Sequence, residues 1–168
     1  MKKIIQLTVA LLLTLGLYSN SFGQYPQDPP PAGYSSIYRM YNSSSGKHLL
    51  AGRTEADNLT SYGGTPWVNE GLMGFVNNTS GEPIYRFYSN SAGHYFSTNS
   101  TAPAGYVSEG LIGYGWSAPM TALSTPVYRY VRISGGTKHL YTTNYSELAG
   151  NPSWRYEGIE FHLFIRGW

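Results

Sequence analysis

The chain has 168 residues and no cysteine, and its 11 Lys and Arg nearly balance its 9 Asp and Glu. The lack of cysteine excludes a disulfide-stabilised scaffold, and the lack of any basic run argues against a nucleic-acid partner. Charged residues make up 12% of the chain and aromatic residues 15%, which is typical of short strands joined by many turns.

The first 23 residues have the features of a cleavable export signal. Two lysines precede an apolar run over residues 4–17, and Ser21 and Gly23 place small side chains at the −3 and −1 positions of a cleavage site. The run is short for a membrane span, and no second apolar stretch follows it. We therefore expect cleavage after Gly23 and a secreted or periplasmic protein. Removal of the two lysines leaves nine basic and nine acidic residues, so the mature chain is close to neutral.

A proline-rich arm follows the export signal. Four of the ten residues from Gln24 to Gly33 are proline, which favours an extended polyproline II conformation. We predict that residues 24–35 form a short, stiff spacer before a single domain over residues 36–168.

The rest of the chain repeats one pattern three times, in residues 36–80 (copy 1), 81–124 (copy 2) and 125–168 (copy 3). Each copy opens on an aliphatic-Tyr-Arg step, continues to a histidine, and closes on Glu-Gly-aliphatic. The opening tyrosines are separated by 47 and 43 positions, a period that indicates a repeat architecture. The equivalent residues are Tyr38, Tyr85 and Tyr128, then His48, His94 and His139, then Glu70-Gly71, Glu109-Gly110 and Glu157-Gly158.

Copy 2 is the most compact and shows the expected elements best. Its β-branched and aromatic runs, separated by Gly, Pro, Asn and Ser, predict four short strands. These strands span residues 83–89, 94–98, 106–109 and 111–116. No segment has a sustained helical period. Copies 1 and 3 carry polar inserts over residues 54–59 and 145–148, each of which predicts one helical turn.

Four strands in each of three copies give about twelve strands, which predicts an all-β fold. A β-trefoil-like barrel is the expected arrangement, because closure removes the sheet edges that many short strands would otherwise expose. A three-sided β-prism of four-stranded sheets is the alternative. A propeller usually needs at least four blades, so three copies argue against it.

The repeated charges predict a structural network. An arginine can bind a carboxylate through two parallel hydrogen bonds, so we expect Arg–Glu pairs that fix the register, either within one copy or between neighbours. The residues of this network are Arg39, Arg86 and Arg129 with Glu70, Glu109 and Glu157. Three ligand-binding pairs are the alternative interpretation. The glycine after each glutamate predicts a β-bulge or a positive φ angle.

The three repeated histidines allow several interpretations. Three imidazoles from equivalent copies can converge on one zinc ion, but no Cys or Asp lies at ligand spacing beside them. A histidine that hydrogen-bonds to local backbone after a turn is the favoured interpretation, and sugar contact is the second. The sequence therefore predicts no metal site and no cofactor.

Catalysis also finds little support in the sequence. No G-x-S-x-G turn and no cysteine nucleophile are present. The three glutamates resemble paired carboxylates for glycoside cleavage, yet an active site is normally unique and these residues occur three times. We therefore predict that the protein is not an enzyme.

The repeat resembles that of the DUF5648 family. Copy 3 carries the resemblance most closely, in Val127-Tyr128-Arg129-Tyr130, in residues 138–144 (KHLYTTN) and in residues 154–161 (WRYEGIEF). Copy 2 keeps most of the pattern without the acidic insert, and copy 1 departs most after His48. The resemblance covers residues 36–164. It implies an exported bacterial β-repeat module and names no activity.

The favoured function is binding of glycans or cell-surface polysaccharide, in the manner of a lectin. Aromatic rings with neighbouring Asn, Thr and Ser side chains can stack on sugars and hydrogen-bond to them. The tentative binding residues are His94, Tyr95, Ser97, Thr98 and Asn99 in copy 2, and His139, Tyr141, Thr142, Thr143 and Asn144 in copy 3. The alternative is a structural or protein-interaction module, of inhibitor or adhesion type, that uses the loop from Thr54 to Pro66.

Overall fold

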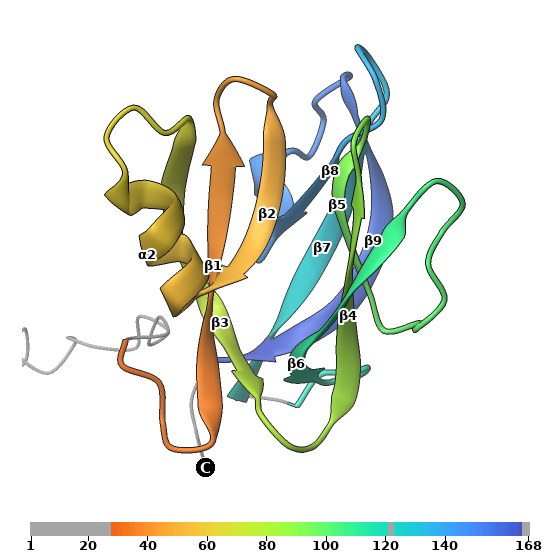
Figure 1. The fold of residues 1–168 in the computed structure, drawn as a ribbon. Coiled ribbons are helices and arrows are strands. Elements are labelled where there is room, and N and C mark those ends of the chain that lie inside the picture. Colours follow the sequence, from red (N-terminus) through yellow and green to blue (C-terminus); the bar gives the residue numbers. More distant parts are fainter. Residues whose placement is uncertain (1–27, 121–122, 166–168) are drawn as a thin grey trace, which may run out of the picture.

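The chain is an all-β protein in the computed structural model, which describes residues 28–120 and 123–165 (Figure 1). Within these residues nine antiparallel strands form one open sheet, accompanied by one short α-helix and one 3₁₀ turn. The predicted export signal and the first residues of the proline-rich arm lie outside the described residues.

The strands fall into the three copies. Copy 1 contains β1 (Tyr34–Asn42), β2 (Lys47–Gly52), the helix α2 (Arg53–Ser61) and β3 (Trp67–Asn77). Copy 2 contains β4 (Glu82–Ser89), β5 (Gly93–Ser97) and β6 (Val107–Gly115). Copy 3 contains β7 (Ser124–Arg132), β8 (His139–Thr142), the 3₁₀ turn η2 (Tyr145–Glu147) and β9 (Trp154–Phe164).

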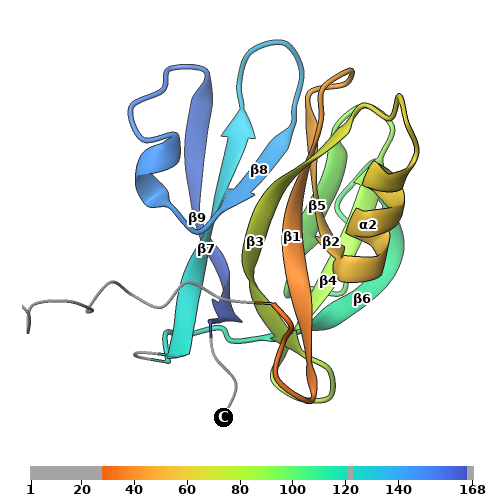
Figure 2. The same ribbon diagram turned by 90° about the vertical axis from the view of Figure 1, so that its left-hand side faces the viewer.

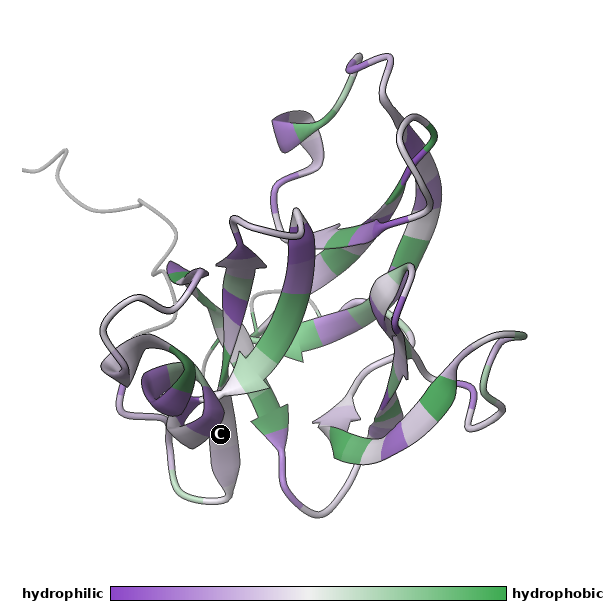
Figure 3. Ribbon diagram, turned by 45° about the horizontal axis from the view of Figure 1, so that its top comes forward, coloured by the Kyte–Doolittle hydropathy of each residue, from purple (hydrophilic) through white to green (hydrophobic). Residues whose placement is uncertain are grey.

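The same pairing is repeated in each copy. The first strand lies in the middle, so β1 pairs with β2 and β3, β4 with β5 and β6, and β7 with β8 and β9. The copies join through the ends of their third strands, where Asn77 pairs with Tyr114 and Phe75 with Phe164. Figure 2 shows copy 3 (β7, β8 and β9) beside the other two units, and Figure 3 shows the three units grouped around a common centre.

The prediction of four strands per copy is wrong. The expected third and fourth strands of copy 2 are one strand, β6, which continues through Gly110. Gly110 lies opposite Arg86, and the β4–β6 register shifts between Ile84 and Tyr85 and between Arg86 and Phe87, as at a β-bulge. Gly71, Gly110 and Gly158 have φ angles of 120°, 97° and 130°, which agrees with the expected positive φ. The nine strands thus form an open sheet in place of a closed twelve-stranded barrel.

The two polar inserts adopt helical structure of different length. Helix α2 spans nine residues, more than the single turn expected, and buries Ala56 against the sheet. The η2 turn has three residues, and the Asn144 side chain accepts a hydrogen bond from the Ser146 backbone N–H at its start.

Within the described part of the chain, no helix has both the length and the apolar character needed to cross a membrane.

Apolar side chains from all three copies pack into one core. Ile37 and Leu50 of copy 1, Phe96 of copy 2, and Val127 and Phe161 of copy 3 are at most 2% exposed and belong to the same cluster. Figure 3 shows apolar and polar residues following one another along several strands, whereas β8 and the last parts of β3 and β9 are buried continuously. The core therefore fixes the position of each copy relative to the others.

Tyr141 ties copy 3 to copy 2 within this core. Its hydroxyl accepts a hydrogen bond from the Phe96 backbone N–H at 2.8 Å and donates one to the Phe96 carbonyl at 3.1 Å. We expect Tyr141→Phe to lower the free energy of unfolding by about 1–3 kcal/mol, because it leaves two buried backbone groups without a partner. Urea unfolding measures this loss. Tyr62→Phe, at a side chain that is 76% exposed, is the control, and equal stability of the two variants would contradict the prediction.

Candidate functional site

Each copy holds an arginine, a glutamate and a histidine in one group. In copy 2, Arg86 Nε lies 2.9 Å from Glu109 Oε2, and His94 Nε2 lies 3.5 Å from the same oxygen. The other copies have the same arrangement, with Arg39, Glu70 and His48 in copy 1 and with Arg129, Glu157 and His139 in copy 3. The expected Arg–Glu pairs are therefore present, each within one copy.

Each arginine also has a second carboxylate, and two of these come from another copy. Glu55 of α2 lies 2.7 Å from Arg86 of copy 2, and Glu147 of η2 lies 2.9 Å from Arg39 of copy 1. The acidic inserts thus link copy 1 to copy 2 and copy 3 to copy 1. The sequence showed the inserts but not their partners, because these contacts span 31 and 108 positions of the chain.

Copy 2 has no acidic insert, and the seam between copies 2 and 3 is closed differently. Arg129 donates to the Tyr95 hydroxyl at 2.7 Å, and its guanidinium lies 4.8 Å from the centroid of the Tyr95 ring. The second carboxylate of Arg129 comes from its own copy, from Glu160. The Tyr95 ring also packs edge-on against His139, with centroids 5.0 Å apart. An aromatic ring therefore takes the place of the acidic insert.

The three histidines are neutral at pH 7. Burial, with a smaller contribution from the neighbouring arginine, lowers the pKa of His48, His94 and His139 from 6.5 to about 4 in each case. For His139 the Glu157 carboxylate partly opposes this effect. Within residues 28–120 and 123–165, no three His, Asp or Glu side chains lie close enough to hold a metal ion. The imidazoles belong to three separate ion-pair groups.

A polar pocket lies between copies 1 and 3 and contains several of the predicted binding residues. Its volume is about 150 Å³, and its lining includes Arg39, Glu70, Thr143, Asn144 and Glu147. Burial raises the pKa of Glu147, but hydrogen bonds from Arg39 and Thr142 outweigh it and hold the pKa below its usual value. Thr143 is half-buried and Asn144 is exposed, so these two side chains are accessible to a ligand.

The remaining predicted residues of copy 3 serve the fold. Thr142 is 2% exposed, and its hydroxyl donates to Glu147. His139 is 8% exposed and lies beside Glu157. Tyr141 is a core residue whose hydroxyl is already bound by Phe96, so it offers no surface to a ligand. We therefore drop it as a binding candidate.

The predicted residues of copy 2 do not form a second site with those of copy 3. Ser97 is buried and accepts a hydrogen bond from the Asn99 backbone N–H, while the Asn99 side chain accepts one from Thr101. His94 lies beside Glu109, and Tyr95 lies against Arg129. Thr98 is half-buried. These residues mainly shape their own turn and the seam with copy 3.

A cluster of tyrosines in copy 3 was not predicted from the sequence. The rings of Tyr145 and Tyr156 meet edge to face with centroids 5.3 Å apart, and Tyr128 lies 5.4 Å from Tyr145. Tyr130 lies beneath them, 2% exposed, and donates from its hydroxyl to the Tyr145 carbonyl. Tyr145 is 50% exposed and Tyr156 41%. We call Tyr128, Tyr145 and Tyr156 the tyrosine platform.

The platform is specific to copy 3, and comparison of the copies would have found it. Tyr156 precedes the Glu-Gly step of copy 3, where the other copies have Asn69 and Ser108. Tyr145 belongs to the insert that copy 2 lacks, and it lies between Asn144 and Glu147 of the polar pocket. The platform and the pocket thus share one 3₁₀ turn.

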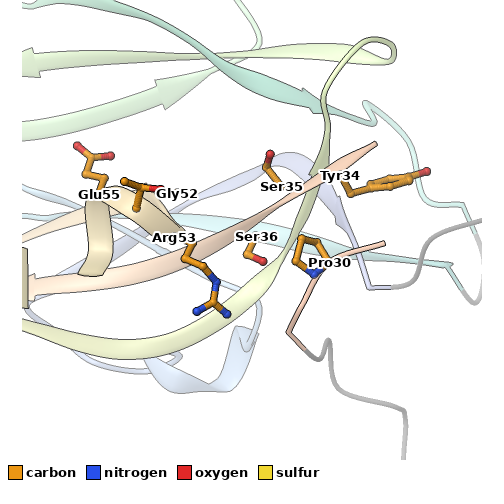
Figure 4. A pocket seen from close by; sticks show the side chains of 8 residues that line it. Pro30, Tyr34, Ser35, Ser36, Gly52, Arg53 and Glu55 are labelled. Atoms are coloured by element: carbon orange, nitrogen blue, oxygen red, sulfur yellow. The ribbon is translucent and has the colours of Figure 1, made fainter. Parts of the chain in front are cut away.

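A second pocket lies where the end of the arm meets the start of α2 (Figure 4). It has a volume of about 420 Å³, and Ser36, Arg53 and Glu55 are among its polar residues. These groups already have partners, because Ser36 donates to Asp28 at 2.6 Å and Arg53 forms an ion pair with Asp28. Glu55 binds Arg86. These contacts of Asp28 attach the arm to the domain, and the polar groups of the pocket are engaged in them or in the pair with Arg86.

The resemblance seen in the sequence is confirmed by comparison with protein families. The model of DUF5648, described as a domain of unknown function, matches residues 36–164. No curated protein and no solved structure matches the chain. The matched segment takes in the tyrosine platform, the polar pocket and all three Arg-Glu-His groups, and the chain belongs to the DUF5648 family.

Proposed function

We propose that the protein is an exported, non-catalytic module that binds glycans or cell-surface polysaccharide in copy 3. The tyrosine platform carries this proposal, because two of its rings are about half exposed beside accessible polar groups, Thr143 and Asn144. The apolar face of a sugar ring stacks on an aromatic side chain, while its hydroxyls need a few well-placed hydrogen-bond partners. The platform and the pocket supply both.

The rings are held in place before any ligand binds. Tyr145 and Tyr156 meet at an interplanar angle of 89°, and the Tyr130 hydroxyl fixes the backbone of Tyr145 from below. Tyrosine has only two side-chain torsions, so an ordered tyrosine loses little entropy on binding. A preformed platform of this kind favours recognition without a conformational change.

The charged residues support a role without catalysis. A glycosidase needs one carboxylic acid with a raised pKa beside a second carboxylate. Glu147, which lines the polar pocket, has its pKa lowered instead, by Arg39 and Thr142 against the effect of burial. Glu70, the other carboxylate of this pocket, is bound to Arg39 at 2.8 Å. Both carboxylates act as ion-pair partners.

A glycan array followed by titration calorimetry tests the proposal. Tyr156→Asn, which introduces the residue of copy 1, is expected to weaken binding of the selected glycan at least tenfold, or by about 1.4 kcal/mol. The expected cause is the loss of a stacking surface. Stability should change little, because Tyr156 is 41% exposed.

Tyr62→Asn is the matched control, since Tyr62 is 76% exposed and lies outside the platform. Equal affinity of the wild type and Tyr156→Asn would contradict the assignment of the site. Failure of the wild type to bind any glycan or cell-wall polysaccharide at millimolar concentration would contradict the function.

Two further predictions form part of this proposal. Cleavage after Gly23 is checked by sequencing the N-terminus of the exported protein.

The trefoil-like relation of the three copies is supported by their equivalent pairing around a common centre, with three strands per copy. A three-sided β-prism is the alternative arrangement.

The second candidate function is protein interaction through the segment from Thr54 to Pro66. Its support is the exposed apolar surface there, because Tyr62 is 76% exposed and the nearby Val68 51%. The same two variants separate the functions. Loss of cell-surface binding in Tyr62→Asn, with binding kept in Tyr156→Asn, would favour the interaction module.

A further inference from the structure

Copy 3 has a pocket beside the turn between β7 and β8 that the tyrosine platform does not use. Its volume is about 420 Å³, and its lining consists of Val131, Arg132, Ile133, Gly136, Thr137, His139, Arg155 and Glu157. Gly135 and Gly136 have φ angles of 74° and 97° and carry no side chain over the turn. The pocket is therefore open to solvent.

The turn beside this pocket lacks a contact that the corresponding turns of copies 1 and 2 receive. Lys47 of copy 1 donates to the Asn90 carbonyl in the first turn of copy 2, at 2.7 Å. Lys138 of copy 3 makes the same contact with the Ser45 carbonyl in the first turn of copy 1. Copy 2 has Gly93 in place of this lysine. No lysine from copy 2 can therefore cover the equivalent turn of copy 3.

The uncovered turn carries charges that are specific to copy 3. Arg132 and Arg155 both line the pocket. They come from the neighbouring strands β7 and β9, at the end where Val131 pairs with Arg155 and Arg132 pairs with Trp154. The equivalent positions in the other copies are uncharged. They hold Asn42 and Ser89 in place of Arg132, and Val68 and Val107 in place of Arg155. The common scaffold does not require arginine at either position.

The pocket has an excess of positive charge. Its one carboxylate, Glu157, is bound to Arg129 at 2.9 Å, whereas Arg155 approaches it only to 3.4 Å and is 66% exposed. Within the described ranges, Arg132 has no carboxylate within ion-pair distance. His139 is neutral at pH 7, since burial lowers its pKa to about 4. Two guanidinium groups are thus available to a ligand.

We infer that this pocket binds the carboxylate or sulfate group of an acidic polysaccharide, an inference that rests on the proposed glycan binding and specifies its charge. The planar guanidinium of arginine binds such an oxyanion through two parallel hydrogen bonds. The Thr137 hydroxyl at the rim is a further donor. The inferred ligand is therefore a polymer of uronic acids or of sulfated sugars.

Arg155 of the pocket and Tyr156 of the tyrosine platform lie on the two faces of one strand. Arg155 and Tyr156 are successive residues of β9, so their side chains point to opposite faces. At this end β9 pairs with β7 alone, because its pairing with β3 occurs at Phe164. At the end near Arg155 the other edge of β9 thus has no strand partner within the described chain, and a long polymer can cross it there and contact both faces.

Calorimetry with three oligosaccharides tests the inference: an oligogalacturonate, a sulfated heparin fragment, and a neutral glycan taken from the array. The double variant Arg132→Asn/Arg155→Val introduces the residues of the other copies. It is expected to weaken acidic binding at least tenfold and to leave neutral binding unchanged. Acidic binding by the wild type should also weaken between 50 and 500 mM salt, because salt screens exposed charges. The two acidic oligosaccharides show whether the pocket prefers a carboxylate or a sulfate group.

Arg53→Asn is the charge control, because Arg53 is 52% exposed and its partner, Asp28, lies away from copy 3. Equal affinity of the wild type and the double variant for the acidic oligosaccharides would overturn the inference. If Tyr156→Asn still weakened binding in that case, the proposed glycan binding at the tyrosine platform would stand. Equal affinity of the wild type for neutral and acidic ligands would also overturn it. If the wild type binds no glycan of either kind, the proposed function fails, and the inference fails with it.

Discussion

Acidification from pH 7 to pH 4.5 is expected to lower the free energy of unfolding by several kcal/mol. His48, His94 and His139 have a pKa of about 4 in the folded protein, lowered by burial from an ordinary value of 6.5. Between these two values the unfolded chain binds protons that the folded chain does not, so stability falls as the pH falls. Each histidine contributes up to about 3 kcal/mol, which makes the total comparable with the 5–15 kcal/mol stability of a typical domain.

Urea unfolding at pH 7.0, 5.5 and 4.5 measures this effect. His94→Gln is expected to flatten the pH dependence by about one third, because one of three equivalent proton-binding groups is removed. The window above pH 4.5 isolates the histidines. Glu147, whose pKa lies below its usual 4.5, loses its stabilising contribution only at lower pH. Parallel pH curves for the wild type and His94→Gln would contradict the prediction.

Arg129→Met is expected to cost about 3–5 kcal/mol of stability, because it leaves Glu160 without a cation and leaves Glu157 with only the exposed Arg155. Arg129 pairs with Glu157 and Glu160, whose side chains are 21% and 15% exposed. It also binds the Tyr95 hydroxyl and packs on that ring, which connects copy 3 to copy 2. Its removal therefore affects both the ion pairs and the seam. Urea unfolding at pH 7 measures the loss.

Arg155→Val provides the comparison for Arg129→Met. Arg155 lies 3.4 Å from the same Glu157 but is 66% exposed, so we expect its loss to cost less than about 0.5 kcal/mol. The double variant Arg129→Met/Glu157→Gln should recover part of the loss, because it removes one of the unpaired charges. Similar stabilities of Arg129→Met and Arg155→Val would show that the network does not hold the copies together.

The repeated residues were the most predictable part of this protein. Arg86 and Glu109 stand out in a chain with few charges, and their recurrence at equivalent positions pointed to a paired role. The partner proved to be in the same copy, because Arg86 lies directly opposite Gly110 in the β4–β6 ladder. Pairing within one copy depends on short-range register, and short-range register follows from local pattern.

The number of strands was harder to predict. A glycine between two apolar runs indicates a break, yet the chain passes through Gly110 as a bulge. A bulge and a strand end have the same local signal, and only the pairing partner decides between them. The partners of Glu55 and Glu147 were unpredictable for a similar reason, since each depends on how two copies pack.

The sequence by itself determined the family, the all-β class, the three copies and their Arg–Glu pairs, because each of these follows from residue type and spacing. The tertiary structure decided which differences between the copies matter. Packing buried Tyr141 in the core, gathered Tyr145 and Tyr156 on one surface, and left the turn after Arg132 without the lysine contact that the other two turns receive. These outcomes depend on contacts between residues far apart in the chain, which no local pattern encodes.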